Sequence, residues 1–492
     1  MGTNSASAKS RNSLTHVSFR SRGYSRRECL STLITLFAGR GFGLLVWAHL
    51  ITVFLLHESS MAQQPGTKLW EFQTGATVVS SPALGADGTI YIGTGNLDAI
   101  NNGAFYSISP DGKTNWYFQP RSSVSASPAI SQDGTVYVMC ANGKLYALAA
   151  DGTTNWVVNT GARCVSSPAI GVDGTLYVGV VVNTFSKLYA VRPDGRTNWV
   201  VTLGSQVIST PASVQFSSPA IGPDGTVYLG SLEGKVYAVS PAGRTNWVAA
   251  LGAPTYSSPV IGPDGTIYIG ADSSRVYAID RFGRTKWTFS ANGMVESSAA
   301  VSVDGSTIYI GSLGGYLYAL TPSGVQRWVS NGPVSCSAAV CGDGSICYST
   351  SSATFGVSSN HVVQWSFRLP AYGFSSPVVG ADGTVYVAAG TKLYALFGTN
   401  GLADSSWPMF RRDRKHHARS VQCGLKTPQL LPDGNVVITL TIETGRTYQV
   451  QQGTNLRDWA EWVSFSSSSV ATQLVDLTAT NSACRFYRLW AP

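Results

Sequence analysis

The sequence has few charged residues. Asp, Glu, Lys and Arg make up 12% of its 492 residues, against roughly 25% in typical soluble proteins. Heptads of Glu, Lys and Leu are absent, which excludes a coiled coil, and a hydrophobic content of 44% excludes intrinsic disorder. The chain has instead 52 Gly, 22 Tyr and 13 Trp. That composition is typical of many short strands joined by tight turns.

Motifs for common catalytic and metal chemistry are also absent. The sequence contains no Gly-x-Ser-x-Gly elbow, His-Glu-x-x-His pair or phosphate-binding loop. Its eight cysteines form neither a Cys-x-x-Cys motif nor an adjacent pair. After residue 62 the histidines are His361, His416 and His417. Two adjacent histidines are too few for a zinc site, so we interpret His416-His417 as part of a solvated linker.

The net charge of +8 comes from two local segments. Residues 1–62 hold seven basic and two acidic residues, and the run 411–419 holds five basic and one acidic. Residues 63–404 hold 17 basic and 18 acidic residues, so the body is nearly neutral. A nucleic-acid partner would need a basic face, so we predict none.

Residues 1–62 have the order of a targeting segment. A basic stretch precedes the apolar run Phe42–Leu56, and Ser60-Met61-Ala62 places small residues just before Gln63. The apolar run has 15 residues, whereas a membrane span needs about 20. We predict a signal peptide. The alternative is an uncleaved anchor over Leu30–Leu56, and Arg26-Arg27 resembles a twin-arginine export signal.

The body repeats one pattern eight times, at spacings of 39 to 51 residues. Each unit has an Asp-Gly turn, seven of these turns are followed about 25 residues later by a Trp, and the eighth Trp precedes the first turn. The Asp residues are Asp87, Asp133, Asp173, Asp224, Asp264, Asp304, Asp343 and Asp382. The Trp residues are Trp70, Trp116, Trp156, Trp199, Trp247, Trp287, Trp328 and Trp365. A period near 40 residues is typical of β-propeller blades.

Each unit divides into four strands, which we call A to D. Strand A is Ser-Pro-Ala-Ile, strand B Thr-Val-Tyr-Leu-Gly, strand C Lys-Val-Tyr-Ala-Val, and strand D carries the Trp. Pro in strand A is tolerated if A is the innermost edge strand. The chain starts with a lone D-type strand, Lys68–Phe72, and its last unit ends at strand C, Lys392–Leu396. We therefore predict an all-β, eight-bladed propeller in which these two strands complete the eighth blade.

The turns fix the two ends of this propeller. Asp-Gly between strands A and B predicts a type I′ hairpin turn, which needs positive φ, and a second turn such as Asp111-Gly112 joins C to D. Both turns lie at one end, so the B–C and D–A loops lie at the other. The loops expected to be long there are Thr94–Ala104, Val180–Ser186, Leu203–Phe216 and Thr350–His361. Variable loops on a rigid scaffold are the usual recognition sites.

The repeat resembles the pyrroloquinoline-quinone-type propeller family. The motif is Leu-Tyr-Ala-Leu followed by Gly and Trp, as in Leu145–Leu148 with Gly152 and Trp156, and the resemblance covers roughly residues 66–400. That family includes quinoprotein dehydrogenases and the propeller subunit of the bacterial outer-membrane assembly machine. Trp407-Pro408-Met409-Phe410-Arg411 also resembles a segment that often accompanies these repeats. The resemblance implies the fold but leaves the function open.

The resemblance to quinoprotein dehydrogenases implies a cofactor site that this sequence does not match. Those enzymes hold the quinone beside a disulfide of adjacent cysteines and use carboxylates around calcium. No adjacent Cys pair occurs here, and the repeated Asp is the residue that a tight turn demands. We interpret the eight Asp as structural and the eight Trp as packing between blades. We predict no catalytic, cofactor-binding or metal-binding residue and disfavour both the quinone and calcium.

Serine pairs recur before strand A. They stand at Ser80-Ser81, Ser166-Ser167, Ser217-Ser218, Ser257-Ser258 and Ser375-Ser376. We expect them to ring one mouth of the channel. Without a base they are polar lining rather than nucleophiles.

The last residues form a separate module. Residues 405–422 read as a basic linker between the propeller at 63–404 and a small β-sandwich-like domain at 423–492. Strands are expected at Asn435–Ile442, Thr447–Gln452 and Cys484–Trp490. The segment resembles β modules that end secreted bacterial proteins. Cys423 and Cys484 bracket it and could form a disulfide in an oxidising compartment.

The remaining cysteines divide into two groups. Cys140 and Cys164 read as small buried hydrophobic residues. Cys336, Cys341 and Cys347 crowd one repeat with no His nearby, which argues against zinc.

These observations support one leading hypothesis and two alternatives. The leading one is an exported, non-catalytic scaffold that binds an envelope protein or glycan through the B–C and D–A loops. The alternatives are a quinone-dependent oxidoreductase and an extracellular adhesin or carbohydrate-binding protein. We expect a periplasmic or extracellular monomer that contacts a membrane only through an uncleaved N-terminal segment.

Overall fold

The computed structural model describes most of the chain after residue 62. The described residues are 63–95, 103–161, 166–182, 185–205, 217–331, 334, 336–371, 375–398, 400–403, 408–411, 413 and 416, and then 424–425, 429–430, 436–441, 447–453, 460–466, 471–476 and 486–490. The predicted signal peptide and the alternative anchor lie outside them. None of these residues belongs to a helix long and apolar enough to cross a membrane.

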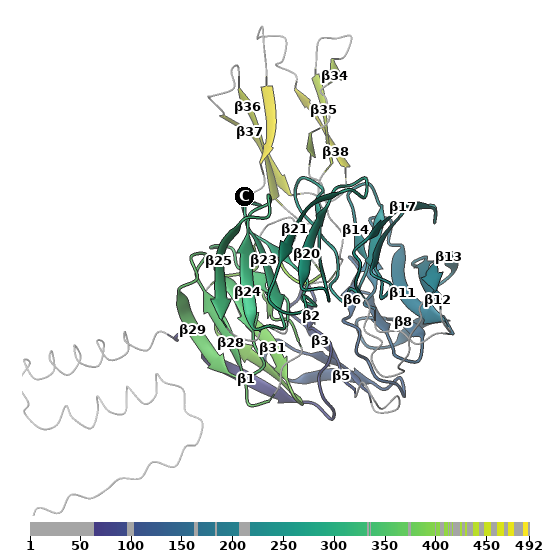
Figure 1. The fold of residues 1–492 in the computed structure, drawn as a ribbon, viewed down its shortest axis with the longest axis vertical. Coiled ribbons are helices and arrows are strands. Elements are labelled where there is room, and N and C mark those ends of the chain that lie inside the picture. Colours follow the sequence, from purple (N-terminus) through teal and green to yellow (C-terminus); the bar gives the residue numbers. More distant parts are fainter. Residues whose placement is uncertain are drawn as a thin grey trace, which may run out of the picture. The chain divides into compact units, whose positions relative to one another are not determined.

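The body is an eight-bladed β-propeller whose blades are antiparallel sheets of four strands (Figure 1). Blade 1 consists of β2 (Ala83–Leu84), β3 (Ile90–Gly93), β4 (Phe105–Ile108) and β5 (Thr114–Phe118). Blade 2 consists of β6 (Ala129–Ile130), β7 (Val136–Met139), β8 (Lys144–Leu148) and β9 (Thr154–Asn159). Blade 3 consists of β10 (Ala169–Ile170), β11 (Leu176–Val182), β12 (Phe185–Val191) and β13 (Thr197–Ser205). Blade 4 consists of β14 (Ala220–Ile221), β15 (Val227–Gly230), β16 (Lys235–Val239) and β17 (Thr245–Ala250).

The second half of the ring repeats the same order. Blade 5 consists of β18 (Val260–Ile261), β19 (Ile267–Ala271), β20 (Arg275–Ile279) and β21 (Thr285–Ser290). Blade 6 consists of β22 (Ala300–Val301), β23 (Ile308–Ser312), β24 (Tyr316–Leu320) and β25 (Gln326–Asn331). Blade 7 consists of β26 (Ala339–Val340), β27 (Ile346–Ser349), β28 (Ala353–Val357) and β29 (Val363–Arg368). Blade 8 consists of β30 (Val378–Val379), β31 (Val385–Ala389), β32 (Lys392–Leu396) and β1 (Lys68–Gln73).

Blade 8 closes the ring with strands from both ends of the propeller sequence, as predicted. Strand β1 pairs antiparallel with β32, with Trp70 opposite Ala395. Glu71 on β1 also accepts hydrogen bonds from Lys392 on β32 and from Lys68, each at 2.7 Å. These two ammonium groups lower the pKa of Glu71 to about 2. The closing seam therefore combines a backbone ladder with a charge pair across the two strands.

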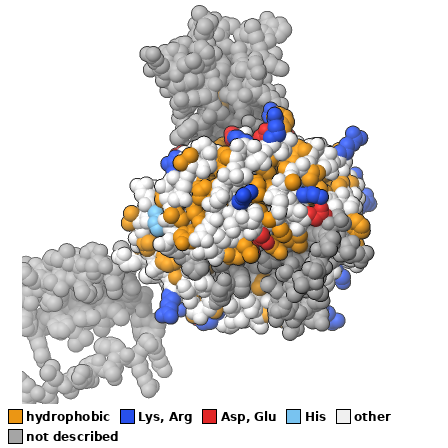
Figure 2. Space-filling model, viewed as in Figure 1, with side chains coloured by type: hydrophobic (Ala, Val, Ile, Leu, Met, Phe, Trp, Pro, Cys, Tyr) orange, Lys and Arg blue, Asp and Glu red, His pale blue; other side chains and the backbone are white. Residues whose placement is uncertain are grey.

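Burial follows the position of each strand within its blade. Strands B and C are almost entirely buried, whereas strand D alternates between exposed and half-buried residues. This agrees with the low charge content, since both faces of the inner strands are covered by neighbouring blades. The surface seen in Figure 2 likewise carries hydrophobic side chains with few charged groups between them.

Two of the four expected long loops are strands instead. Val180–Ser186 belongs mostly to β11 and β12, where Val181 pairs with Ser186 and Val182 with Phe185. Consecutive valines favour an extended ladder over a loop. Thr350–His361 contains β28, the strand C of blade 7, whose sequence Ala-Thr-Phe-Gly-Val departs from the repeat. The central residues of the other two loops lie outside the described residues.

The Asp-Gly turns also differ from the predicted type I′ geometry. In blade 1, Gly85 N donates to Thr89 O and Gly88 N donates to Gly85 O. Gly88 has a φ of 82°, but Asp87 is not among the described non-glycine residues with positive φ. A type I′ turn needs positive φ at both central residues. The loop is longer than two residues, and the Asp carboxylate accepts from Thr89 N at 3.0 Å and so supports the turn.

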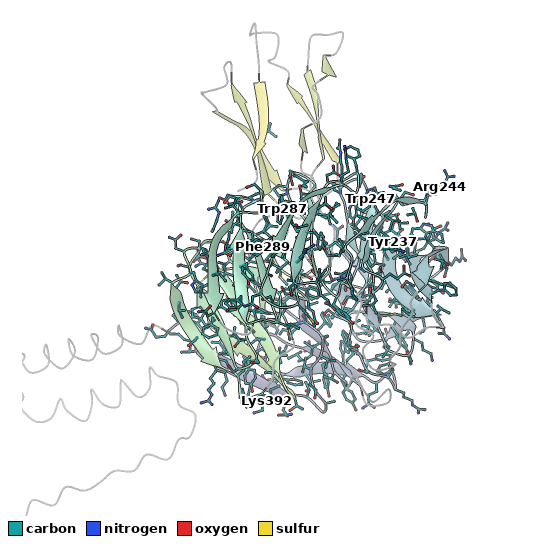
Figure 3. All side chains as sticks on the ribbon, in the orientation of Figure 1. Tyr237, Arg244, Trp247, Trp287, Phe289 and Lys392 are labelled. Atoms are coloured by element: carbon teal, nitrogen blue, oxygen red, sulfur yellow. The ribbon has the colours of Figure 1, made fainter. Side chains whose placement is uncertain are left out.

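The blade Trp ties each outer strand to the next blade (Figure 3 labels Trp247 and Trp287). Its indole Nε1 donates to a carbonyl in the following C–D turn, at 2.8 to 2.9 Å, in Trp70, Trp116, Trp156, Trp199, Trp247, Trp287 and Trp328. The ring also lies against the turn glycine, so close that a Cβ on Gly152 would come within 2.6 Å of Trp116 Cδ2. Trp365 lies in the same way against Gly66.

The C-terminal segment contains two further sheets. One comprises β33 (Gly424–Leu425), β34 (Gln429–Leu430), β35 (Val436–Thr441) and β38 (Ala471–Asp476). The other comprises β36 (Thr447–Gly453), β37 (Ala460–Ser466) and β39 (Phe486–Trp490). The three strands expected there are present as β35, β36 and β39, and β33, β34, β37 and β38 were missed. Cys423 and Cys484 lie outside the described residues, so their disulfide stays a prediction.

The contact between Trp and glycine predicts different costs for two Gly→Ala substitutions with the same backbone strain. Gly152 and Gly134 both have a φ of 87°, but a Cβ on Gly134 would meet nothing within 4 Å. We expect Gly134→Ala to lower the free energy of unfolding by about 1 kcal/mol. Gly152→Ala should cost about 1–3 kcal/mol more, because the methyl group displaces Trp116. Equilibrium denaturation measures both, and equal losses would contradict tight packing between Trp116 and Gly152.

Candidate functional site: the axial channel and the loop face

A closed circle of hydrogen bonds surrounds the channel where strand A begins. In each blade the N–H of one serine donates to the Oγ of the equivalent serine in the next blade, at 2.9 to 3.1 Å. The circle runs through Ser81, Ser127, Ser167, Ser218, Ser258, Ser298, Ser337 and Ser376, and Ser376 N returns to Ser81 Oγ. We call these residues the serine ring. Each hydroxyl is engaged in holding a neighbouring blade, which agrees with a lining role.

The sequence pattern found only part of this ring. Pairs of serines predicted five of its members. Ser298 was missed although it follows Ser297, and Ser127 and Ser337 were missed because they follow Ala126 and Cys336. The signal common to all eight is a serine placed two residues before the first residue of strand A. The preceding serine has a separate role, as Ser80 Oγ accepts from Gly93 N at 2.7 Å within one blade.

A segment after blade 8 enters the channel and runs along blade 7. Asn400 Nδ2 donates to Asp343 Oδ2 at 2.7 Å, at the end of the propeller that carries the Asp-Gly turns. Leu402 then forms an isolated antiparallel β-bridge with Cys341. The backbone N–H of Val340, on β26, donates to the carbonyl of Pro408. Strand A is the inner edge of each blade, so this segment lies inside the ring. We call the described residues of 400–416 the channel segment.

The channel segment then crosses the axis. Arg411 Nη1 donates to Ser167 O at 3.0 Å, and His416 Nδ1 donates to Pro128 O at 3.0 Å. These carbonyls belong to the inner edges of blades 3 and 2, and blade 3 is opposite blade 7 in a ring of eight. The crossing is enclosed, since Met409 and His416 are 0% exposed and Arg411 is 2% exposed. The interpretation of His416 as part of a solvated linker is therefore wrong.

Arg411 brings a positive charge into this enclosed space. Burial lowers its pKa to about 9, and the charge of Asp413 opposes that shift. Its two terminal nitrogens donate to backbone carbonyls, those of Ser167 and His416. One ring carbonyl and one carbonyl of the channel segment thus satisfy the two terminal nitrogens of the buried guanidinium, whereas its Nε has no hydrogen-bond partner.

The described residues of the channel do not fit a quinone with calcium. Among the described residues, no three side chains of His, Cys, Asp or Glu converge closely enough to hold a metal ion. The cation available to an acidic cofactor, Arg411, already bonds to its own chain. The Asp residues of the A–B turns bind their own turns instead, as Asp173 does with Thr175 at 2.7 Å. The absence of a cofactor stays a prediction.

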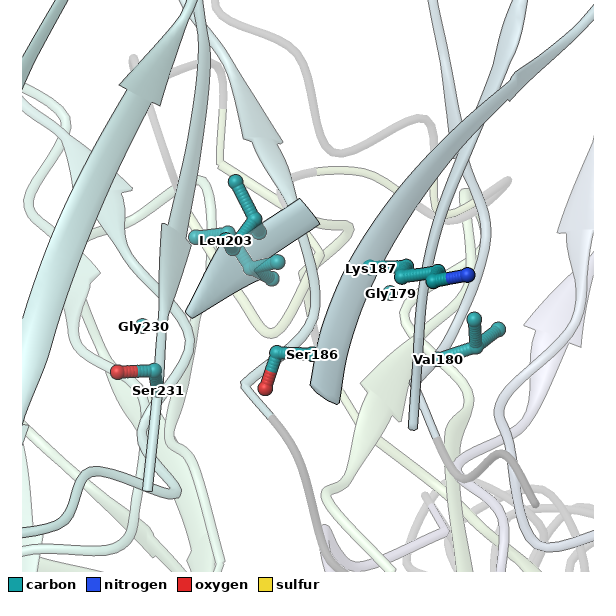
Figure 4. Close-up of a pocket in the computed structure, with 8 residues that line it drawn as sticks. Gly179, Val180, Ser186, Lys187, Leu203, Gly230 and Ser231 are labelled. Atoms are coloured by element: carbon teal, nitrogen blue, oxygen red, sulfur yellow. The ribbon is translucent and has the colours of Figure 1, made fainter. Parts of the chain in front are cut away.

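A small cavity lies between blades 3 and 4 (Figure 4). It is lined by residues of β11, β12, β13 and β15, among them Ser186, Leu203 and Gly230. The cavity volume is about 10 Å³, which is enough for about one water molecule. It is too small for an organic cofactor.

Apolar and acidic residues meet on the face of the B–C and D–A loops, between blades 5 and 6. Met294 and Leu313 are 48% and 44% exposed, and Leu313 N donates to Met294 O at 2.9 Å. Val295 N donates to Ala271 O. This hydrogen bond brings Asp272, the residue after Ala271, close to Met294 and Glu296. We call Asp272, Met294, Glu296 and Leu313 the Met294 patch.

The two carboxylates of the Met294 patch influence each other. Burial raises the pKa of Asp272, whose Oδ1 has no hydrogen-bond partner. Burial and then the charge of Asp272 raise the pKa of Glu296. In the equivalent position other blades have uncharged residues, such as Val79 and Tyr256. Both carboxylates would thus gain from a basic group, because it would offset charges that the fold leaves poorly compensated.

Comparisons with known proteins find the same fold. A family model described as outer membrane protein assembly factor BamB matches residues 59–281 and 184–389. BamB from Moraxella catarrhalis is 16% identical with a TM-score of 0.55, over 67% of this chain and 99% of its own. Sqt1 from Saccharomyces cerevisiae is 13% identical with a TM-score of 0.55, over 69% of this chain and 100% of its own.

An enzyme also shares the fold. The quinohemoprotein alcohol dehydrogenase of Comamonas testosteroni is 12% identical with a TM-score of 0.53, over 70% of this chain and 78% of its own. No curated protein sequence matches the chain. Identities this low show a shared propeller and do not assign an activity.

Packing of the channel segment predicts contrasting effects for two methionines. Met409 is completely buried, whereas Met294 is 48% exposed. We expect Met409→Ala to lower the free energy of unfolding by about 2–5 kcal/mol, because it leaves a cavity among the inner strands. Met294→Ala should change it by less than about 0.5 kcal/mol. Guanidinium denaturation distinguishes the two. Similar values for both would mean that the segment contributes nothing to the core.

Proposed function

The chain belongs to the family of the outer membrane protein assembly factor BamB, and from this premise we propose that it is an exported, non-catalytic propeller that binds a protein of the bacterial cell envelope. The family match spans the propeller. The proposal places the partner on the B–C and D–A loops, with the Met294 patch as the central contact. Export would follow from the targeting pattern of residues 1–62.

The observation that carries the proposal is the filled channel. An enclosed, partly apolar cavity with convergent polar groups is the usual small-molecule site. Here the channel segment crosses that space, and the two terminal nitrogens of Arg411 donate to the carbonyls of Ser167 and His416. Binding then falls to the outer surfaces, where a rigid ring presents loops from all eight blades.

The Met294 patch favours a protein partner of defined chemistry. Two exposed apolar side chains lie beside two carboxylates with raised pKa. A segment with an apolar residue next to Lys or Arg would cover the methionine and leucine and neutralise the acids. Aromatic and apolar anchors surrounded by polar contacts are typical of protein interfaces.

Site-specific cross-linking in cells tests the partner and its position. A photo-reactive amino acid at Leu313 should give one main cross-linked product, an envelope protein identified by mass spectrometry. The same amino acid at Phe282, 56% exposed in a C–D turn at the opposite end, is the matched control and should not give that product. Cross-linking from Phe282 alone, or only glycan retained by the purified chain, would contradict the proposed surface.

Two further measurements make the proposal sharper. The double variant Met294→Asp/Leu313→Asp should weaken binding to the identified partner at least about tenfold, since two added charges would be desolvated in the interface, while Phe282→Asp should bind as the wild type. Purified chain supplied with pyrroloquinoline quinone, calcium and an oxidisable alcohol or sugar as electron donor should reduce no dye. Quinone-dependent turnover would overturn the non-catalytic assignment.

A further inference from the structure

Blade 7 differs from the other blades at two positions that face each other. In seven blades strand B carries a tyrosine, namely Tyr91, Tyr137, Tyr177, Tyr228, Tyr268, Tyr309 and Tyr386. The residue whose amide closes the A–B turn is Gly or Ser in the same blades, namely Gly85, Ser131, Gly171, Gly222, Gly262, Ser302 and Gly380. Blade 7 has Cys347 in place of the tyrosine and Cys341 in place of the small residue.

The two exchanged positions are close in space. In blade 5, a Cβ on Gly262 would come within 2.9 Å of Tyr268 Cε2. Replacing the tyrosine by Cys347 vacates that space, and the side chain of Cys341 occupies it. The two Sγ atoms are 3.8 Å apart, and the residues are 4% and 3% exposed. No other group separates them.

We propose that Cys341 and Cys347 are a disulfide site that links strands A and B of blade 7 when the chain meets an oxidising environment. The two cysteines are six positions apart in sequence, so the hairpin β26–β27 brings them together without the rest of the ring. The oxidant is a small-molecule disulfide or a thiol–disulfide oxidoreductase. This inference does not depend on a partner or on the proposed function.

The reaction proceeds by two exchanges. The Cys341 thiolate attacks one sulfur of the oxidant disulfide, forms a mixed disulfide and releases the first oxidant thiolate. The Cys347 thiolate then attacks Cys341 Sγ, forms the Sγ–Sγ bond and releases the second oxidant thiolate. Each cysteine gives up one proton, and the oxidant takes up two electrons.

The surroundings assign different roles to the cysteines of this blade. The hydrogen bond with Cys347 lowers the pKa of Cys341, whereas Cys347 has its pKa raised by the same contact and by burial. Cys341 also lies next to the exposed turn at Asp343. Cys336 is buried, and burial raises its pKa to about 11. Its Sγ donates to Ser349 O at 3.2 Å, so it stays reduced and serves as the internal control.

The bond would also secure the entry of the channel segment. The backbone of Cys341 forms a β-bridge with that of Leu402, and the next residue, Gly342, donates its N–H to Gly401 O at 2.7 Å. A disulfide in this hairpin fixes the edge on which the segment begins. Oxidation should therefore stabilise the blade and the channel segment together.

Alkylation of the purified full-length chain tests the proposal. The chain is equilibrated with oxidised glutathione, unfolded in the presence of iodoacetamide and digested. We expect label on Cys336 and none on Cys341 or Cys347, with both becoming labelled after reduction. The unlabelled peptide should be about 2 Da lighter than its reduced form, the mass of two hydrogens. Label on Cys341 and Cys347 after oxidation, or a bond from either one to Cys336, would overturn it.

Stability provides a second readout that does not depend on peptide mapping. Oxidation should move the guanidinium midpoint of the wild type and of Cys336→Ser upward, and a reductant should reverse the shift. Cys341→Ser and Cys347→Ser should each lose the response to oxidant. A midpoint shift of the same size in Cys341→Ser would refute the assignment. If one of the two single variants does not fold, the other still provides the test.

Discussion

The serine ring is the constraint on which the rest of the structure depends. A propeller blade cannot bury its faces alone, so something must fix how each blade meets the next. Here one backbone N–H of each blade donates to a serine hydroxyl of its neighbour around a complete circle, closed from Ser376 to Ser81. At the outer edge the indoles of seven blades, such as that of Trp156, donate to the following C–D turn. Inner and outer contacts together fix the angle between blades.

The ring also determines what the channel can do. Where the channel segment crosses, the backbone carbonyl of Ser167, a member of the ring, accepts a hydrogen bond from Arg411. Because these groups hold the chain's own segment, the axis offers no convergent donor set among the described residues. Recognition then depends on the loops. On their face, the Met294 patch combines exposed apolar surface with two carboxylates that lack compensating charge.

The sequence predicted the blades better than the channel. Eight copies of Asp-Gly and Trp fix the number of blades, and the orphan strand at Trp70 fixes the closure. The failures occur where a local rule competes with a nonlocal contact. Val180–Ser186 forms a ladder because valines pair across the hairpin. Arg411 and His416 are buried because distant blades supply carbonyls, which no pattern within residues 405–422 reveals.

Equilibrium unfolding of Ser298→Ala tests the central claim most directly. The substitution removes the hydroxyl that accepts from Ser258 N at 2.9 Å and leaves that buried N–H without its partner. The account predicts a loss of about 1–3 kcal/mol in the free energy of unfolding, in a single transition of the propeller. Ser323→Ala, in an exposed C–D turn, should stay within about 0.5 kcal/mol of the wild type. A Ser298→Ala variant as stable as Ser323→Ala would contradict the claim that the serine ring holds the blades together.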